Sequence, residues 1–266
     1  MLTQNQFVSF VFLFFGIVSA CGKFVYSPYV SKTVERNLND KNLIKISAKE
    51  SQVSSSFKIA IISDTHDYYS DLEKQVDYIN NLSNDIAFVL HTGDATNLGM
   101  LVEWETFREK IEQLEVPFLL AIGNHDMLTN GVDIYKQIFG RKLDFSFVFK
   151  QTEFFIINNN NWESDGTAPN LSYLESMLKK SSATHKIILG HVQPDDDHRY
   201  SESQIQEMKN LIDTYSVKYF INGHNHNYGV GSFATAKRVT VGSSVKGKIL
   251  ILTINNSSVE DEHVSF

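Results

Sequence analysis

The chain has 266 residues, of which 42% are hydrophobic and 21% are charged, with 14 glycines, four prolines and a single cysteine, a composition that excludes collagen-like, disordered and disulfide-framework proteins. Its 24 basic and 31 acidic residues give a net charge of −7 without a basic stripe, so no role as a nucleic-acid scaffold is expected. Nine histidines accompany the one cysteine. Any metal site must therefore use histidine, carboxylate and amide ligands instead of thiolates.

The N-terminal segment has the features of a secretory signal. Residues 1–20 carry no charge, and the apolar run over 7–17 is too short to span about 30 Å of hydrocarbon but long enough for the hydrophobic part of a signal peptide. Small residues at 18–20 precede Cys21, and this pattern resembles a bacterial lipobox, whose cleavage leaves a lipidated cysteine at the new N-terminus. We predict a signal peptide over 1–20 and an exported lipoprotein that Cys21 anchors in a membrane, on its periplasmic or extracellular side. A signal anchor, or a cysteine that stands there by chance, is the alternative.

Three further segments are expected after the signal peptide. Ser, Lys and Asn are frequent up to about residue 56, which predicts the lipidated cysteine and a tether over 21–56. A single globular domain is predicted over 57–256, followed by a C-terminal tail over 257–266.

The body of the chain alternates predicted strands and helices. Short apolar runs suit strands that are buried on both faces, at 57–62, 86–90, 117–122, 186–189 and 218–221. Segments with helical periodicity lie between most of these runs, near 72–82, 100–114, 170–178 and 202–215. This alternation predicts an α/β sheet with helices on its faces.

Two segments show a different pattern. Residues 145–157 are typical of a β-hairpin, and further alternating strands are expected over 229–255. The sequence therefore predicts an α/β fold in which two β-sheets pack as a sandwich flanked by helices.

Polar motifs follow all five buried strands at their C-terminal ends. In open α/β sheets ligands gather beyond the carboxyl ends of the strands, so these motifs are expected to form one constellation of Asp, Asn and His side chains. The glycines within them permit sharp turns and close approach of the backbone. The motifs are Ser63-Asp64-Thr65-His66, His91-Thr92-Gly93-Asp94, Gly123-Asn124-His125-Asp126, Gly190-His191 and Asn222-Gly223-His224-Asn225-His226.

In this order the motifs resemble those of the calcineurin-like metallophosphoesterase family, namely D-x-H, G-D, G-N-H-D, G-H and G-H-x-H, over residues 58–228. The resemblance implies a four-layer αββα fold of the metallo-dependent phosphatase type and a centre of two metal ions. Divalent or trivalent Mn, Fe, Zn, Ni or Co would suit these nitrogen and oxygen ligands, and the identity of the ions stays open. The resemblance also implies which residues bind the ions. Asp64, His66 and His226 would hold the first ion, Asn124, His191 and His224 would hold the second, and Asp94 would bridge both.

The chemistry of such a centre is phosphoryl transfer to water. Two cations about 3.5–4 Å apart clamp the attacking and leaving oxygens of an in-line displacement, and a metal-bound hydroxide is the expected nucleophile. The resemblance leaves His125 unligated, as a general acid or transition-state stabiliser. We predict a membrane-anchored phosphoesterase for a phosphomonoester or phosphodiester. The alternative is a non-catalytic metal-binding lipoprotein or scaffold that retains the fold.

Three neighbouring residues are candidates to support the site. Many family members have an aspartate three residues after the bridging carboxylate, where it orients the unligated histidine; here Asn97 takes that place, and its side chain is expected to orient His125 by hydrogen bonding. Asp126 is expected to support the ligands without binding metal. His91 either does the same or is a packed histidine at the end of a strand.

The loop at 158–169 has two interpretations. It is either a substrate loop that presents Trp162 as a stacking surface or a polar surface loop with one anchored tryptophan. Arg141, His198 and Arg199 are candidates to touch a phosphate group, and the sequence does not decide among them. The acidic run at 195–197 is expected to form a solvated loop.

Overall fold

The computed structural model describes residues 27–265, so the predicted signal peptide over 1–20 and Cys21 lie outside the described residues. The helices are α2 (Leu38–Lys49), α3 (Tyr69–Asn80), α4 (Leu101–Ile111), α5 (Gly131–Ile138), α6 (Leu171–Lys180) and α7 (Glu202–Thr214), with the short 3-10 turns η1 (His125–Met127), η2 (Trp162–Ser164) and η3 (Ser244–Lys246). The strands are β1 (Phe57–Ile62), β2 (Ile86–His91), β3 (Phe118–Leu120), β4 (Phe145–Phe149), β5 (Thr152–Ile156), β6 (His185–Leu189), β7 (Tyr219–Asn222), β8 (Gly229–Phe233), β9 (Ala236–Thr240), β10 (Lys248–Ile254) and β11 (Val259–Ser265).

The strands form two mixed sheets. The first has the order β11-β10-β1-β2-β3, and the second has the order β4-β5-β6-β7-β9-β8. β1, β2 and β3 run parallel, as do β5, β6, β7 and β9, whereas β4, β8, β10 and β11 are antiparallel to their neighbours. All five predicted buried strands are confirmed, and so is the hairpin at 145–157. Each of the five buried strands carries its polar motif at its carboxyl end, where the ends of parallel strands lie together.

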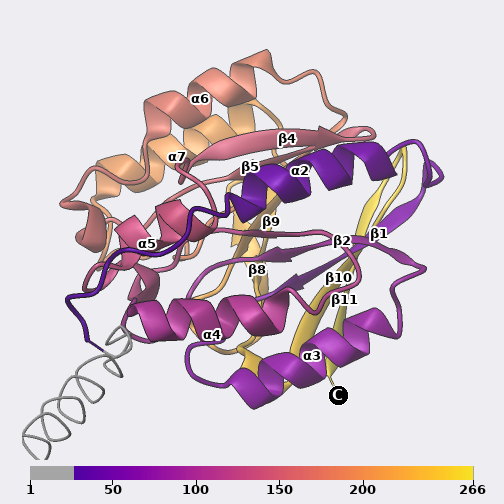
Figure 1. Ribbon diagram of the computed structural model, residues 1–266. Coiled ribbons are helices and arrows are strands. Elements are labelled where there is room, and N and C mark those ends of the chain that lie inside the picture. Colours follow the sequence, from indigo (N-terminus) through magenta and orange to yellow (C-terminus); the bar gives the residue numbers. More distant parts are fainter. Residues whose placement is uncertain (1–26, 266) are drawn as a thin grey trace, which may run out of the picture.

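Three apolar clusters divide the molecule into four layers. One cluster lies between the first sheet and the helices α3, α4 and α5, and it includes the fully buried Trp104. A second lies between the two sheets and includes Phe88 and Phe154. A third joins the second sheet to α6 and α7 through residues such as Met208. Figure 1 shows α3 and α4 on one side of the strands and α6 and α7 on the other, as the predicted αββα arrangement requires.

One part of the predicted tether over 21–56 is a helix instead. In α2, Leu38 packs into the outer cluster of the first sheet and Ile46 packs between the sheets. Asn39 pairs with the edge strand β3, because its amide nitrogen donates to the Leu120 carbonyl at 3.0 Å and its amide oxygen accepts from the Leu120 N–H at 3.0 Å. The helix was missed because two asparagines lie on its buried face and weaken the apolar periodicity.

The expected C-terminal tail over 257–266 is also corrected. Residues 259–265 form β11, which pairs antiparallel with β10 at the edge of the first sheet. This strand alternates half-buried and exposed residues and carries several charges, a composition that protects an edge strand from further pairing. Within the part of the chain that the structure describes, no helix has both the length and the apolar character needed to cross a membrane.

Candidate metal centre

The constellation predicted from the five motifs is present. The loops after β1, β2, β3, β6 and β7 carry, in that order, Asp64 with His66, Asp94, Asn124 with His125, His191, and His224 with His226. Three sets of His and Asp side chains have potential ligand atoms within 4.8 Å of one another, namely Asp64/His66/His226, His66/Asp94/His125 and Asp94/His191/His224.

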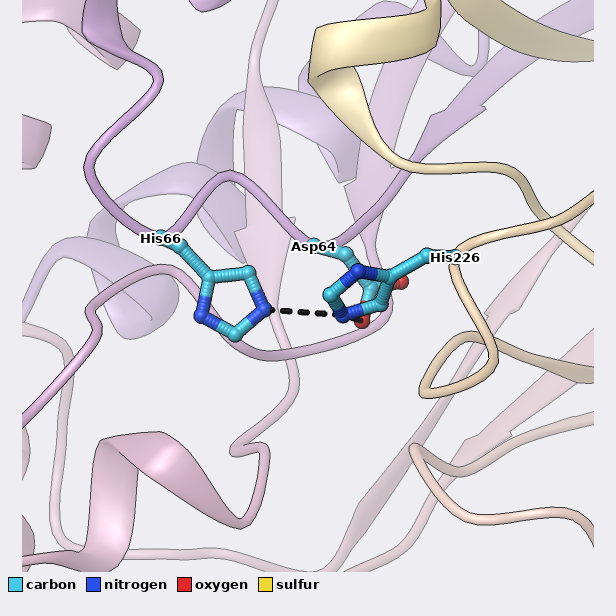
Figure 2. A group of neighbouring side chains, drawn as sticks. All are labelled: Asp64, His66 and His226. Atoms are coloured by element: carbon cyan, nitrogen blue, oxygen red, sulfur yellow. Dashed lines mark hydrogen bonds and ion pairs between the residues drawn. The ribbon is translucent and has the colours of Figure 1, made fainter.

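The first group joins two loops that are far apart in the sequence. His66 Nε2 lies 3.1 Å from His226 Nε2, and His226 Nε2 lies 3.6 Å from Asp64 Oδ1. Figure 2 shows the two imidazole rings meeting edge to edge beside the Asp64 carboxylate. Asp64 and His66 are buried, whereas the His226 side chain is 42% exposed, so the first group is open to solvent on the His226 side.

The second group lies deeper. Asn124 Oδ1 is 3.0 Å from His191 Nε2 and 2.9 Å from His224 Nδ1. His191 is fully buried, and its other nitrogen, Nδ1, lies 3.0 Å from the carbonyl oxygen of Thr92. That contact orients the ring so that Nε2 points towards Asn124.

Asp94 reaches both groups through one carboxylate oxygen. Its Oδ2 lies 3.0 Å from His191 Nε2 and 3.6 Å from His66 Nε2, and its Oδ1 accepts the backbone N–H of His125 at 2.8 Å. Burial alone would raise the pKa of Asp94, but the charge and hydrogen bond of His191 hold this pKa well below its usual range. In return, although burial lowers the pKa of His191, the charge of Asp94 raises it to about 9.

The backbone of the site adopts an uncommon conformation. Five proposed ligands have φ between 49° and 71°, the left-handed region that residues other than glycine seldom occupy. Hydrogen bonds between the loops hold them there: the N–H groups of Asp64 and His66 donate to the carbonyl oxygens of Gly93 and Asp94. Strain of this kind is typical of functional sites whose surroundings over-determine the conformation. The five residues are Asp64, His66, Asp94, His224 and His226.

Two glycines allow the central loops to touch. A Cβ atom placed on Gly123 would lie 2.1 Å from the backbone nitrogen of Asp94, and one placed on Gly93 would lie 2.7 Å from the Cα of Gly123. Gly93 also has a φ of +106°. Only glycine at these positions lets the loop of Asp94 lie against the loop of Asn124.

His125 is half-buried at the edge of the groups. Its Nδ1 lies 2.7 Å from the backbone carbonyl oxygen of Asn97, and its ring meets the His66 ring edge-on at 4.7 Å. The expected contact between Asn97 and His125 therefore runs through the main chain, not through the Asn97 side chain. The sequence could not show this, because a backbone carbonyl is present whatever residue follows Thr96.

His91 supports the site from beneath. Its Nε2 lies 3.0 Å from the Thr65 hydroxyl, which in turn lies 3.1 Å from the Ser244 hydroxyl, and Ser244 donates to Gln75 Oε1 at 2.7 Å. On its other side, Nδ1 of His91 accepts the Gly93 N–H at 3.1 Å. This buried chain ties the loop of Asp64 to the loop of Asp94, and His91 is itself packed at the end of β2.

Asp126 and Asn159 hold the loops of the second group. Asp126 accepts the N–H groups of Thr96 and Gly123 at 2.8 and 2.9 Å, and burial raises its pKa to about 7. Asn159 Oδ1 accepts the N–H of His191 at 2.7 Å. Sequence reasoning missed Asn159, although it follows the end of β5 just as the other motifs follow their strands.

The donor atoms fit transition-metal ions. Imidazole nitrogens, carboxylate oxygens and an amide oxygen are ligands that divalent first-row metals accept, and a ligating imidazole must be neutral. Burial lowers the pKa of His66 to about 4 and that of His224 to about 3, so both rings offer a lone pair near neutral pH. His191, whose pKa is raised to about 9 by Asp94, would release its Nε2 proton when an ion binds. Asp64, His66 and His226 would hold one ion; Asn124, His191 and His224 would hold the other; and Asp94 would contact both.

A curated protein is similar in sequence to part of this chain. The chain is 32% identical to a probable glycerophosphodiester phosphodiesterase, GpdQ, of Arcobacter nitrofigilis over 88 residues, which are 33% of this chain and 32% of that protein. The chain thus matches about a third of the length of this curated relative.

Two solved structures are similar in fold. Purple acid phosphatase PPD1 from yellow lupin seeds aligns with a TM-score of 0.64 and 17% identity, over 80% of this chain and 52% of that one. GAP50, described as the anchor in the inner membrane complex of Plasmodium, aligns with a TM-score of 0.60 and 15% identity, over 79% and 84% of the two chains. These likenesses confirm the predicted two-sheet α/β fold.

A family model described as Calcineurin-like phosphoesterase matches residues 57–228. The match spans more than half of the chain, and its bounds enclose all seven residues that the motifs nominate as metal ligands. The chain therefore belongs to the calcineurin-like phosphoesterase family, a class of metal-dependent phosphoric ester hydrolases.

Proposed function

We propose that this protein hydrolyses a phosphate monoester or diester at a centre of two metal ions. The observation that carries the proposal is the position of Asp94. One of its two carboxylate oxygens, Oδ2, lies within 3.6 Å of both His66 and His191, which belong to different groups. Such a carboxylate holds two cations close together and offsets part of their mutual repulsion. When bound, the ions would neutralise the phosphate charge and activate water for attack.

The protein contributes a proton at the leaving group. As water adds to phosphorus, the bond between phosphorus and the alcohol oxygen breaks, and that oxygen needs a proton. The Nδ1 of His125 is engaged with the Asn97 carbonyl, which leaves Nε2 to face the substrate. In this proposal protonated His125 donates the Nε2 proton to the departing alcohol.

The test is a metal-dependent assay of the purified chain. We expect turnover of matched aryl phosphate mono- and diesters with added Mn²⁺, and its loss in Asp94→Asn, which keeps the size of the side chain but removes its charge. The partial identity to a probable glycerophosphodiester phosphodiesterase supports including a glycerophosphodiester as a third substrate. Elemental analysis of the loaded protein distinguishes Mn, Fe, Zn, Ni and Co.

A non-catalytic metal-binding protein or scaffold is the competing outcome. A protein of similar fold is described as an anchor, so the fold alone does not carry the proposal. Binding of two metals per chain without turnover of any of the three esters would favour this alternative. Failure to bind metal at all would contradict the ligand assignment.

We also propose that the protein is exported and held at a membrane by a lipidated Cys21, on the periplasmic or extracellular side. The support comes from the sequence, in which an uncharged apolar segment ends in small residues directly before the single cysteine. Incorporation of labelled fatty acid into the expressed protein, and its loss in Cys21→Ser, would be the expected result. Equal labelling of both forms would contradict it.

A further inference from the structure

A half-exposed tryptophan lies on a loop that is attached to the second ligand group. Trp162, in η2, is 58% exposed, whereas the other tryptophan, Trp104, is fully buried in the core. The guanidinium carbon of Arg199 lies 4.6 Å from the centre of the Trp162 ring. Arg199 therefore covers one face of the indole, while more than half of the Trp162 side-chain surface stays open to solvent.

Arg199 is held in place by its neighbours. Its Nη1 donates to Glu163 Oε2 at 2.8 Å, and the two side chains are only 9% and 16% exposed. Its backbone N–H donates to Asp196 Oδ1 at 3.2 Å. A charged pair that is this well buried fixes both partners, so the indole of Trp162 rests on a rigid support.

Both loops of this platform are anchored to the second ligand group. Asn159, three residues before Trp162, accepts the backbone N–H groups of His191 and Val192 at 2.7 and 3.0 Å. Tyr200, directly after Arg199, donates its hydroxyl to the Asn159 carbonyl.

We propose that the open face of Trp162 binds a planar aromatic group in the alcohol portion of the phosphoester substrate. This inference rests on the proposed function, because it assigns the substrate class of the same site. Arg199 on the opposite face would repel a cationic group, whereas an uncharged ring can stack on the indole. Stacking of a ring on an aromatic side chain strengthens binding by about five- to a hundredfold.

The experiment compares two phosphonates that cannot be hydrolysed. Phenylphosphonate and methylphosphonate are titrated into the metal-loaded protein by calorimetry. We expect phenylphosphonate to bind at least about fivefold more tightly. In Trp162→Leu the two affinities should become equal, whereas Trp162→Phe should keep most of the preference. Val148→Ala, an exposed position at the turn end of the β4–β5 hairpin, serves as the control and should keep the full preference.

Tryptophan fluorescence supplies a second readout. Because Trp104 is buried, a saturable change in emission with phenylphosphonate should come from Trp162 and should be lost in Trp162→Phe. A phenyl preference that is the same in wild type and Trp162→Leu would overturn the proposal, as would the absence of any preference. If the preference is present but no ester is hydrolysed, the proposed function fails while the stacking site stands.

A kinetic comparison locates the ring relative to the phosphate. If phenyl phosphate is favoured over glycerol phosphate in a Trp162-dependent way, the ring lies next to the phosphate.

Discussion

At the scale of single residues, the orientation of His125 is determined by the main chain. Its Nδ1 contacts the carbonyl oxygen of Asn97, not the amide side chain. A carbonyl oxygen can orient an imidazole by accepting a hydrogen bond from its N–H, but it carries no full charge to stabilise an imidazolium. The replacement of the family's usual aspartate by Asn97 is therefore tolerable for the position of the ring.

Removal of the Asn97 side chain should consequently have little effect. We expect Asn97→Ala to retain kcat within about threefold of the wild-type value, since the carbonyl group remains. Steady-state kinetics on an aryl phosphate measure this directly. A loss of a hundredfold or more would show that the amide side chain takes part.

His125→Ala should have a much larger effect that depends on the leaving group. General acid catalysis typically contributes about 10²–10⁴ in rate, and it matters most when the departing alcohol is a poor leaving group. We expect a loss of this size on an alkyl phosphate and a clearly smaller loss on a nitrophenyl phosphate. Equal losses on both substrates would point to a role other than proton donation.

At the scale of elements, the loops after β2 and β3 fit together only because glycine occupies position 123. Gly123→Ala would place a Cβ atom 2.1 Å from the Asp94 backbone nitrogen and 2.2 Å from its Oδ1. We expect this change to cost about 1–3 kcal/mol of stability and to weaken metal binding, because the loop of Asp94 must move. Gly229→Ala is the matched control, with no atom within 4 Å of its added Cβ. Denaturant unfolding and metal titration compare the two, and similar values would contradict this account of the close approach.

The edge of β3 depends on α2 in a comparable way. Asn39→Ala removes the acceptor of the buried Leu120 N–H, while the Leu120 carbonyl keeps its hydrogen bond from the Tyr135 hydroxyl. An unsatisfied buried donor costs about 1–3 kcal/mol, and we expect a loss of unfolding free energy in that range. Ser47→Ala, on the exposed side of the same helix, should change stability by less than about 0.5 kcal/mol. A neutral result for Asn39→Ala would mean that the edge finds another partner.

At the scale of the whole molecule, the site concentrates buried acidic groups where both sheets end. Burial raises the pKa of Asp64 and that of Asp126 to about 7, and both lie near the ionised Asp94. Cations at the centre would relieve this mutual repulsion, so metal binding should stabilise the fold.

Removal of metal should therefore lower the melting temperature. At a free metal concentration a hundredfold above Kd, binding at one site adds about 2.7 kcal/mol, which corresponds to several degrees for a chain of this size. We expect calorimetry with and without chelator to show this difference, and Asp94→Asn to reduce it. Melting temperatures that do not respond to metal would contradict the proposed centre.

Much of the architecture could be predicted because it depends on local patterns. The apolar runs of β1, β2, β6 and β7 are unmistakable, since both faces of these strands are buried. By contrast, α2 and β11 were missed, because a helix with asparagines on its buried face and a charged edge strand both lack the expected pattern. Their stability comes from partners elsewhere in the chain.

The sequence by itself determined the nature of the site. The proposed ligands lie just after buried strands, and the carboxyl ends of parallel strands meet at one edge, so the sequence predicted that these side chains gather there. The resemblance of the motifs to those of the family then nominated Asp64, Asp94 and the other residues as ligands. Only the tertiary structure decided how these residues are held. The carbonyl of Asn97, the amide of Asn159 and the stacking of Arg199 on Trp162 join segments distant in sequence, and such contacts leave no periodic pattern in the chain.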